Sequence, residues 1–181
     1  LPALQGLRKD APVVYLGTFS KLLYPGLRLA YLVLPRWAAP RFGEASAALF
    51  RTGHAVEQRA LARFMSSGHL LSHLRRMAPI YAERQSRLRA VLTEGLGEAA
   101  DIRGGQAGLH LCLRLPAARP DIAIAQAAAE RGIIVRALST YCQDVRTRAG
   151  HNGLVLGYGQ VETARIGELT ARLTALCAIH K

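Results

Sequence analysis

A lysine in a short polar turn between two apolar runs is the feature that most constrains this chain. Residues 13–35 read VVYLGTFSKLLYPGLRLAYLVLP, with apolar runs at 13–16 and 29–34. Apolar runs of this length, bounded by glycine and proline, are typical of buried strands. The turn between them carries Lys21 and, seven residues later, Arg28. Burial beside two strands would disfavour the charged form of the lysine and make its amine available for chemistry.

The composition is that of a globular chain with an excess of basic residues. Half of the 181 residues are hydrophobic, a fifth are charged, and the formal net charge is +12. Such a charge raises the possibility of nucleic-acid binding. However, 21 of the 24 basic residues are arginines spread along the chain, without a helix-turn-helix, zinc-finger or aromatic-stacking pattern. A nucleic-acid-binding or purely structural module is therefore the weakest of three hypotheses, because only the charge supports it.

The cysteines and histidines indicate neither a disulfide framework nor a metal site. Cys112, Cys142 and Cys177 are scattered and odd in number, which favours a reducing, cytoplasmic location. His69 and His73 lie four residues apart, but no Glu or Cys completes a zinc set. No apolar run approaches the roughly 20 residues of a transmembrane span, so we expect no membrane partner. The first ten residues lack a signal peptide, and the absence of an initial Met suggests a fragment.

The remaining patterns predict an α+β unit after about residue 100. We expect strands at 11–16 and 27–34, helices at 41–67 and 70–96, a strand at 109–115, a helix at 121–131, strands at 133–135 and 154–158, a polar loop at 139–150, and a final helix at 162–180. Pro79 should kink the second helix, and the arginines of that helix should form a solvated face. Two strands before residue 40 cannot bury a core, which predicts that part of a larger domain is missing.

The residue types of the turn allow two interpretations. The hydroxyls of Thr18 and Ser20, the loop amides and Arg28 could together hold a phosphate. A desolvated Lys21 beside a phosphate site is what a covalent bond to an aldehyde cofactor requires. The alternative is a surface turn with an incidental lysine and arginine. Chemistry alone favours that alternative, because serine, lysine and arginine are common in loops.

The turn also resembles a known family. GTFSKLLYPGLRLAYLVLP resembles the lysine segment of fold-type I pyridoxal-phosphate enzymes and, more closely, that of the aminotransferase-like effector domain of MocR regulators, a branch of the GntR family. Ala30 departs from the family's usual glycine. The segments ALARFMSSGHLLSHLRRMAPIYAERQSRL, GGQAGLHLCLRLP, RGIIVRALSTYC and GLVLGYG follow in the family's order. The resemblance therefore covers nearly the whole chain.

The resemblance implies a fold class and a domain organisation. The class is α/β to α+β, and the chain would be the C-terminal fragment of a fold-type I pyridoxal-phosphate-dependent transferase-like domain. Residues 1–66 would be the remnant of the large cofactor-binding domain with two of its strands. Residues 67–98 would form an interdomain helix, and residues 99–181 a complete small α+β domain.

The resemblance also implies roles for residues of the turn. Lys21 would bind pyridoxal 5'-phosphate covalently, and Arg28 would bind its phosphate. Thr18 would hydrogen-bond the phosphate, while Ser20 either assists or only shapes the turn. In the family, a ring-stacking residue and an acid that pairs with the pyridine nitrogen precede the lysine segment. The chain alone is therefore expected to bind the cofactor weakly or not at all.

One departure bears on catalysis. In aminotransferases of this fold an arginine often clamps the substrate carboxylate, and Val155 would take its place here. Arg136 or Arg114 could substitute for it. Without a bidentate clamp, transamination is less assured, which favours a sensor with weak or no transaminase activity.

Two functional hypotheses follow from the resemblance. The leading one is the effector-sensing region of a homodimeric transcriptional regulator. Its effector would be an amine, an amino acid or pyridoxal phosphate itself, and it would bind DNA only through a winged-helix domain outside this chain. The alternative is part of a stand-alone aminotransferase acting on amino acids, in which Lys21 would also move a proton. The sequence preceding the lysine segment distinguishes the two hypotheses.

Overall fold

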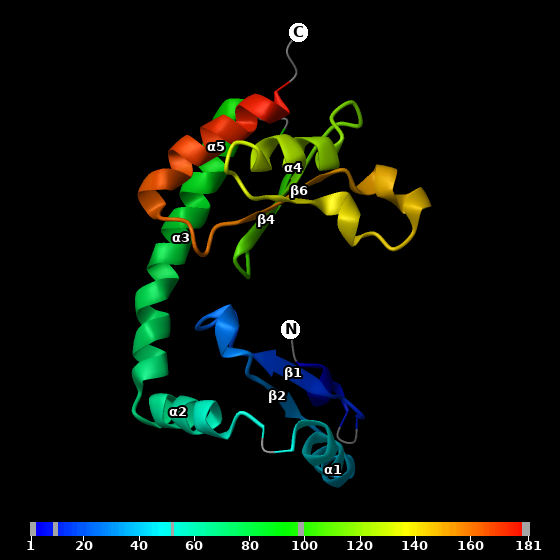
Figure 1. Cartoon of the computed structure of the whole chain (residues 1–181), viewed down its shortest axis with the longest axis vertical. Helices are drawn as coiled ribbons and strands as arrows, with labels where there is room; N and C mark the ends of the chain where they lie inside the picture. Colours follow the sequence, from blue (N-terminus) through cyan, green and yellow to red (C-terminus); the bar gives the residue numbers. More distant parts are fainter. Residues whose placement is uncertain (1–2, 9–10, 52, 98–99, 179–181) are drawn as a thin grey trace. The chain divides into compact units, whose positions relative to one another are not determined.

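A computed structural model describes residues 3–8, 11–51, 53–97 and 100–178, and these fall into two compact units (Figure 1). Unit 1 comprises Leu1–Leu74 and unit 2 comprises Arg75–Lys181. The boundary between them lies inside one long helix, α3 (His69–Leu96). The division into a large-domain remnant, an interdomain helix and a small domain stays a prediction.

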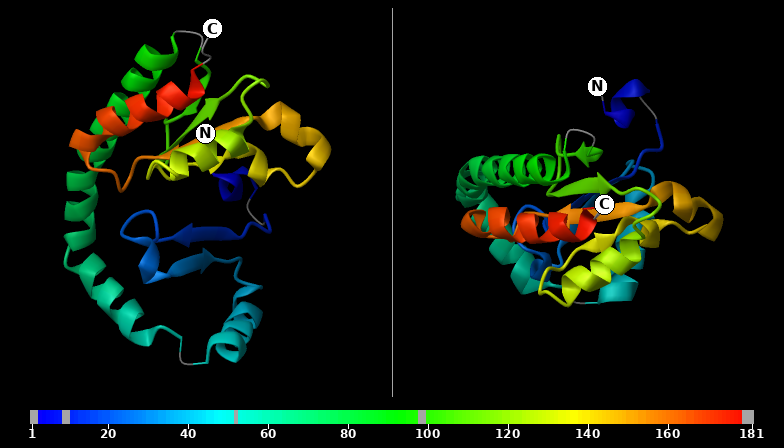
Figure 2. Two further views of the ribbon diagram at one scale, coloured as in Figure 1. Left: turned by 45° about the horizontal axis from the view of Figure 1, so that its top comes forward. Right: turned by 90° about the horizontal axis from the view of Figure 1, so that it is seen from above.

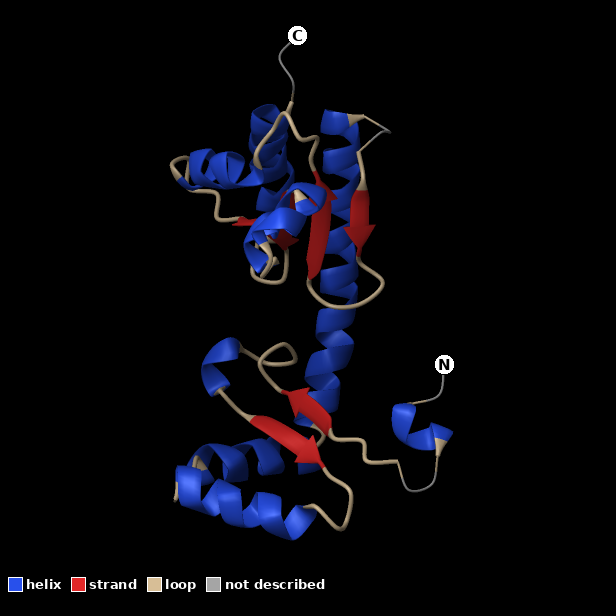
Figure 3. Ribbon diagram, turned by 90° about the vertical axis from the view of Figure 1, so that its right-hand side faces the viewer, coloured by secondary structure: helices blue, strands red, loops and turns tan. Residues whose placement is uncertain are grey.

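Unit 1 contains a two-stranded antiparallel sheet and two helices (Figure 3). Strand β1 (Tyr15–Thr18) pairs with β2 (Ala30–Val33), with Tyr15 opposite Val33. Both strands are shorter than predicted, and their burial was predicted wrongly, since Leu16 is 67% exposed and Val33 56% exposed. Each strand has one neighbouring strand among the described residues, and such a pair cannot bury both of its faces.

The helical region after the hairpin is divided in two. The sequence predicted one helix over residues 41–67, but the structure has α1 (Ala39–Phe50) and α2 (Ala55–Ser66). Between them Arg51 and Gly53 have φ values of 46° and 54°, which no right-handed helix accommodates. The break therefore comes from backbone conformation, which the apolar period of the sequence did not indicate.

Helix α3 runs close to its predicted bounds and continues through Pro79. A proline inside a helix removes one hydrogen bond, to the carbonyl group four residues earlier. That group belongs to Arg75, an exposed residue, so water can replace the lost donor. No described helix is both long enough and apolar enough to cross a membrane.

Unit 2 contains a four-stranded antiparallel sheet in the order β3-β4-β6-β5. The strands and the two further helices of this unit are β3 (Ile102–Gly104), β4 (His110–Arg114), α4 (Asp121–Ala129), β5 (Arg136–Ala137), β6 (Gly153–Gly157) and α5 (Thr163–Cys177). Helix α5 lies alongside the end of α3, where an added Cβ on Gly95 would meet the side chain of Thr174 (Figure 2). The predicted α+β organisation of this region is confirmed.

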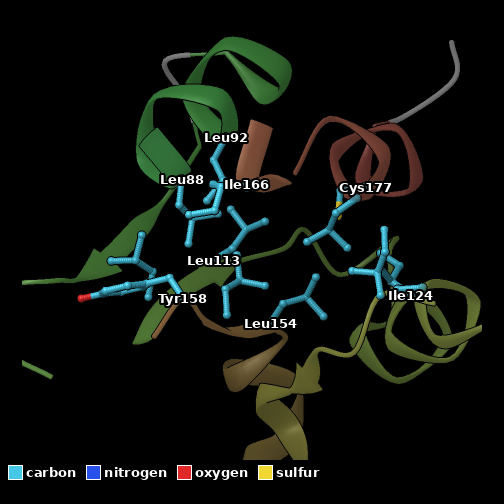
Figure 4. Close-up of a cluster of buried hydrophobic side chains, with 13 residues drawn as sticks. Leu88, Leu92, Leu113, Ile124, Leu154, Tyr158, Ile166 and Cys177 are labelled. Carbon is cyan, nitrogen blue, oxygen red and sulfur yellow. The ribbon is translucent and has the colours of Figure 1, made fainter. Parts of the chain in front are cut away.

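The core of unit 2 lies between the sheet and its helices (Figure 4). Alternate residues of the two central strands face this core and are at most 4% exposed, namely Leu111, Leu113, Leu154 and Leu156. Residues from α3, α4 and α5 complete the cluster, including Leu92, Ile124, Ile166 and Cys177. The alternating leucines that predicted a half-buried strand therefore form the centre of the packing.

Three details of unit 2 differ from prediction. Strand β3 was missed, because its three residues end in a glycine with positive φ. The strand predicted at 133–135 lies instead at Arg136–Ala137, and Ile134 is 82% exposed. The predicted polar loop contains two short 3-10 helices, Leu138–Tyr141 and Val145–His151. These segments have few residues each, and tertiary contacts outweigh such weak local signals.

The arginines of α3 are not all solvated, contrary to prediction. Arg75 and Arg87 are exposed, but Arg84 and Arg89 are half-buried. Arg84 donates from Nη1 to the Gly159 carbonyl at 2.6 Å. Arg89 donates to the carbonyls of two residues of edge strand β3, at 3.2 and 2.8 Å. The Arg89 guanidinium therefore satisfies backbone carbonyls at the edge of the sheet, and that of Arg84 satisfies one in the segment after β6.

Candidate functional site

The turn that carries Lys21 is an ordered loop between β1 and β2. The Phe19 amide donates to the Leu29 carbonyl at 3.1 Å, which closes the base of the loop. The amides of Leu22 and Leu23 donate to the Phe19 carbonyl at 3.2 and 2.9 Å. Backbone hydrogen bonds therefore hold the lysine in a tight turn directly after the first strand.

Two hydroxyls stand at the start of this loop. The Thr18 and Ser20 hydroxyl oxygens are 3.1 Å apart, and the Ser20 amide donates to the Thr18 hydroxyl oxygen at 3.2 Å. This arrangement is an ST-type turn, which places both hydroxyls in one short segment. The predicted phosphate contacts of these two residues stay predictions, but one local structure brings them together.

Arg28 lies at the other end of the loop with a left-handed backbone. Its φ and ψ are 50° and 26°, and its amide donates to the Pro25 carbonyl at 3.3 Å. A non-glycine residue in this conformation is uncommon and costs free energy unless its surroundings impose it. Such outliers gather at ligand sites, so the backbone of Arg28 is consistent with a binding role for this loop.

The structure contradicts the predicted desolvation of Lys21. The sequence predicted a desolvated amine at the ends of buried strands, but Lys21 is exposed, as is Arg28. The reason is the exposure of the strands themselves, since a loop on an open two-stranded sheet remains in water. The Lys21 side chain is therefore accessible to water in the described structure.

An aromatic cluster supports the hairpin beneath the loop. The ring of Tyr31 lies 5.6 Å from the ring of Phe19 and 6.0 Å from that of Tyr15, between centroids. A hydrogen bond with Tyr15, and the charge of that phenol when ionised, raise the pKa of Tyr31 above its usual value. Any Cβ on Gly17 would overlap the ring of Tyr31. The glycine that opens the GTFSK segment therefore lets the ring lie across the strand, a role that the sequence did not indicate.

The variant Gly17→Ala should loosen the loop. The added methyl displaces Tyr31 and removes its contact with Phe19, and a ring pair of this kind contributes modestly to stability. We expect amide exchange at Phe19 to become about fivefold faster, measured by NMR. Gly43→Ala in α1 is the control, because its Cβ meets nothing within 4 Å and alanine favours helix. Unchanged exchange at Phe19 in Gly17→Ala would show that the ring does not support the loop.

The arginines suggested as substitutes for a carboxylate clamp lie in unit 2. Arg136 of β5 is directly opposite Val155 of β6 in the strand register, and its side chain is exposed. Arg114 of β4 is opposite Gly153, and it donates from Nη2 to the Gly150 carbonyl. Arg136 is therefore the better placed of the two to bind an anion beside Val155, because Arg114 is already engaged.

The donor set of the loop fits pyridoxal phosphate at two ends of the molecule. Hydroxyls, amides and a guanidinium suit a phosphate, and a primary amine suits an aldehyde. The pyridine ring would need an acid beside its nitrogen, and the acids of unit 1 among the described residues, Glu44 and Glu57, lie on α1 and α2. In the described ranges no cluster of His, Cys, Asp or Glu is able to hold a metal ion.

Comparisons with known proteins give two kinds of relative. The chain is 34% identical over 171 residues to the probable rhizopine catabolism regulatory protein MocR of Rhizobium meliloti, covering 93% of this chain and 34% of that protein. It is 30% identical over 161 residues to the pyridoxine biosynthesis transcriptional regulator PdxR of Corynebacterium glutamicum, covering 88% of this chain and 33% of that protein. The chain thus spans about a third of the length of these regulators.

The fold is that of aminotransferases. The α-aminoadipate aminotransferase LysN of Thermus thermophilus, solved with N-(5'-phosphopyridoxyl)-L-leucine, superposes with a TM-score of 0.83 and 23% identity. The match covers 98% of this chain and 45% of LysN. No protein-family model matches the chain. Sequence and fold agree, and the chain therefore matches the aminotransferase-like region of MocR-type transcriptional regulators, which confirms the family that the lysine segment indicated.

Proposed function

We propose that this chain is the effector-sensing region of a cytoplasmic transcriptional regulator that binds pyridoxal 5'-phosphate through Lys21. The observation that carries the proposal is the single hydrogen-bonded loop that presents Thr18, Ser20, Lys21 and Arg28 together. Relatives that are transcriptional regulators support it, including one named for pyridoxine biosynthesis. In this proposal the whole protein is a homodimer, and a winged-helix domain outside this chain binds DNA.

Each residue of the loop has a defined task in the proposal. Thr18, Ser20 and Arg28 hold the phosphate by hydrogen bonds and charge. Lys21 presents its amine to the aldehyde carbon, the electrophile that the cofactor supplies when bound. An effector with a primary amine, such as an amino acid, competes with Lys21 for the same carbon. The protein without effector and the protein with bound effector would then differ in the contacts of Lys21. A difference in contacts between two states is what a ligand-driven population shift requires.

The residues of unit 2 favour a sensor over an efficient enzyme. Val155 cannot bind a carboxylate, and the neighbouring Arg136 is a single exposed guanidinium. We propose that Arg136 contacts the carboxylate of an amino-acid effector, with weak or no transamination as the result. The solved aminotransferase LysN is 23% identical to the chain, so its likeness supports the fold and not its reaction.

Borohydride reduction with pyridoxal phosphate tests the role of Lys21. The chain has three lysines, Lys9, Lys21 and Lys181, so each site of labelling is identified by mass spectrometry of peptides. We expect Lys21 to be labelled at least about tenfold more than the other two at excess cofactor, because the proposed phosphate site would hold the aldehyde beside its amine. Arg28→Ala should remove most of this preference, whereas Arg36→Ala, a control outside the loop, should keep it.

Equal labelling of all three lysines would refute the proposal, because it would mean that the loop does not recruit the cofactor. The same samples report affinity. We expect weak binding by the chain alone, since the loop provides no acid for the pyridine ring. A stoichiometric absorbance band that disappears in Lys21→Ala would contradict the expected weakness, while still supporting Lys21 as the attachment site.

A further inference from the structure

Unit 2 contains an apolar pocket that is separate from the lysine loop. Its volume is about 380 Å³, and it lies between α5, the end of β6, the segment 132–135 and α3. Leu88, Leu156 and Leu173 form its floor and are buried. The size and the apolar lining are those of small-molecule sites, which lie near 300–1,000 Å³.

The pocket lies where the sheet is left incomplete. Strand β5 pairs only with Leu154 and Val155, and the preceding segment 133–135 lines the pocket instead of continuing the ladder. The Tyr158 amide donates to the Leu109 carbonyl at 3.1 Å, which fixes the alternation of hydrogen bonds along β6. By this alternation the amide and carbonyl of Gly157 point away from β4, towards the pocket. Gly157 is exposed and offers a backbone donor and acceptor there.

A buried hydroxyl opens into the same pocket. Thr170 lines it and is 4% exposed, yet its hydroxyl forms no hydrogen bond with another described residue. Thr174, one turn further along α5, instead donates to the Ala171 carbonyl at 2.9 Å. No fully enclosed side-chain polar atom in the described ranges lacks a partner, so the Thr170 hydroxyl keeps some exposed surface. An unpartnered hydroxyl at a buried position indicates a polar atom in the occupant.

The rim of the pocket carries two opposite charges. Glu162 and Arg165 line it and are exposed, and neither forms an ion pair or side-chain hydrogen bond within the described ranges. Arg165 precedes Thr170 by five residues of α5, which is about 7.5 Å along a helix axis. The pocket thus has a charged rim and an apolar body. The distance from Arg165 at the rim to the hydroxyl-bearing Thr170 is one that a small molecule can span.

We propose that this pocket binds a hydrophobic α-amino acid with a hydroxyl at the far end of its side chain, of which tyrosine is the simplest form. Arg165 binds the carboxylate, and Glu162 binds the ammonium group. The apolar side chain lies on Leu156 and Leu173, and its hydroxyl pairs with Thr170. The site uses no residue of the lysine loop, so it is independent of the proposed cofactor.

Titration of the whole chain with L-tyrosine and L-phenylalanine tests this site, with amide shifts of Val135 and Gly157 as the NMR readout. We expect tyrosine to bind about tenfold more tightly than phenylalanine, because only tyrosine pairs with Thr170. Thr170→Val keeps the shape and should bring the two affinities to within about twofold of each other. Arg165→Gln should weaken both amino acids by about fivefold or more, whereas Arg76→Gln, a control at an exposed position of α3 outside the pocket, should not.

Two further variants make the outcome decisive. Val161→Trp fills the pocket and should abolish the shifts at Gly157, whereas Lys21→Ala should leave both affinities unchanged. Loss of binding in Lys21→Ala would overturn the proposal, because the amino acids would then occupy the lysine loop. Absence of saturable shifts, or a tyrosine preference that survives Thr170→Val, would overturn it as well. Failure of the labelling at Lys21 bears only on the proposed cofactor.

Discussion

Asp121→Ala should lower the free energy of unfolding of unit 2 by about 3 kcal/mol. Asp121 is 3% exposed, and its carboxylate accepts three hydrogen bonds. The Ser139 amide and hydroxyl donate at 2.8 Å each, and the Gly153 amide donates at 3.2 Å. Alanine would leave these donors without a partner inside the unit. The loss should be large because one carboxylate joins α4, the segment after β5 and the start of β6.

The measurement can separate the two units. Native-state amide exchange in β4 and β6 reports unit 2, whereas the fluorescence of Trp37, the single tryptophan, reports unit 1. Asp121→Asn should cost less, about 1 kcal/mol, because the Ser139 hydroxyl can rotate to accept from the new amide. Asp101→Ala is the control, since Asp101 forms a surface pair with Arg103 at 2.8 Å that water screens. Similar losses in the two alanine variants would contradict the special role of Asp121.

The pKa of Asp121 predicts how this stability depends on pH. Burial raises the pKa of the carboxyl group, but the hydrogen bonds from Ser139 and Gly153 outweigh burial and lower it below its usual value. A lowered pKa in the folded state means that the ionised group stabilises the fold at neutral pH. Its contribution is lost as the pH falls below about 4, the pKa of an unfolded aspartate. The acid-induced loss of stability in unit 2 should therefore be smaller in Asp121→Ala.

The sequence was most informative where local pattern and packing agree. The leucines at alternate positions of β4 predicted a half-buried strand, and α3 was predicted within about a residue because its apolar period is long. The order of the family segments then led to the correct fold, because several matched motifs constrain it more than any single one. The roles of the lysine-loop residues stay predictions, and the structure shows that Thr18 and Ser20 share one turn while Arg28 lies at the other end of the same loop.

The features that the sequence did not reveal depend on distant partners. An apolar run does not say whether a neighbour covers it, so the exposure of Leu16 and Lys21 could not be predicted. The guanidinium of Arg89 binds carbonyls of β3, a strand too short for its own pattern to be recognised. The unpartnered hydroxyl of Thr170 depends on which residues surround it in space. Each of these properties is set by tertiary contacts and not by residue type.

Glycine at position 153 should be indispensable to the sheet of unit 2. A Cβ there would lie 2.5 Å from the Leu113 carbonyl oxygen and 3.3 Å from the Cα of Arg114. Both atoms belong to the backbone of β4, so no side-chain rotation can relieve the overlap. Gly153→Ala should therefore force β4 and β6 apart at the end where Asp121 binds the Gly153 amide. We expect a loss of about 3 kcal/mol in the free energy of unfolding of unit 2, measured by amide exchange in β4.

Gly157→Ala is the matched control, because it changes the same residue type at the other end of the same strand. Its Cβ would meet only the ring of His110, at 3.4 Å, and Gly157 is exposed. Alanine also restricts the unfolded chain more than glycine does, so we expect a change within about 0.5 kcal/mol of zero. Equal losses in the two variants would show that strand propensity determines how β6 tolerates the replacement of glycine by alanine. The close approach of the β4 backbone would then not be the cause. A large loss confined to Gly153→Ala would show that the close contact of β6 with β4 requires glycine at its first residue.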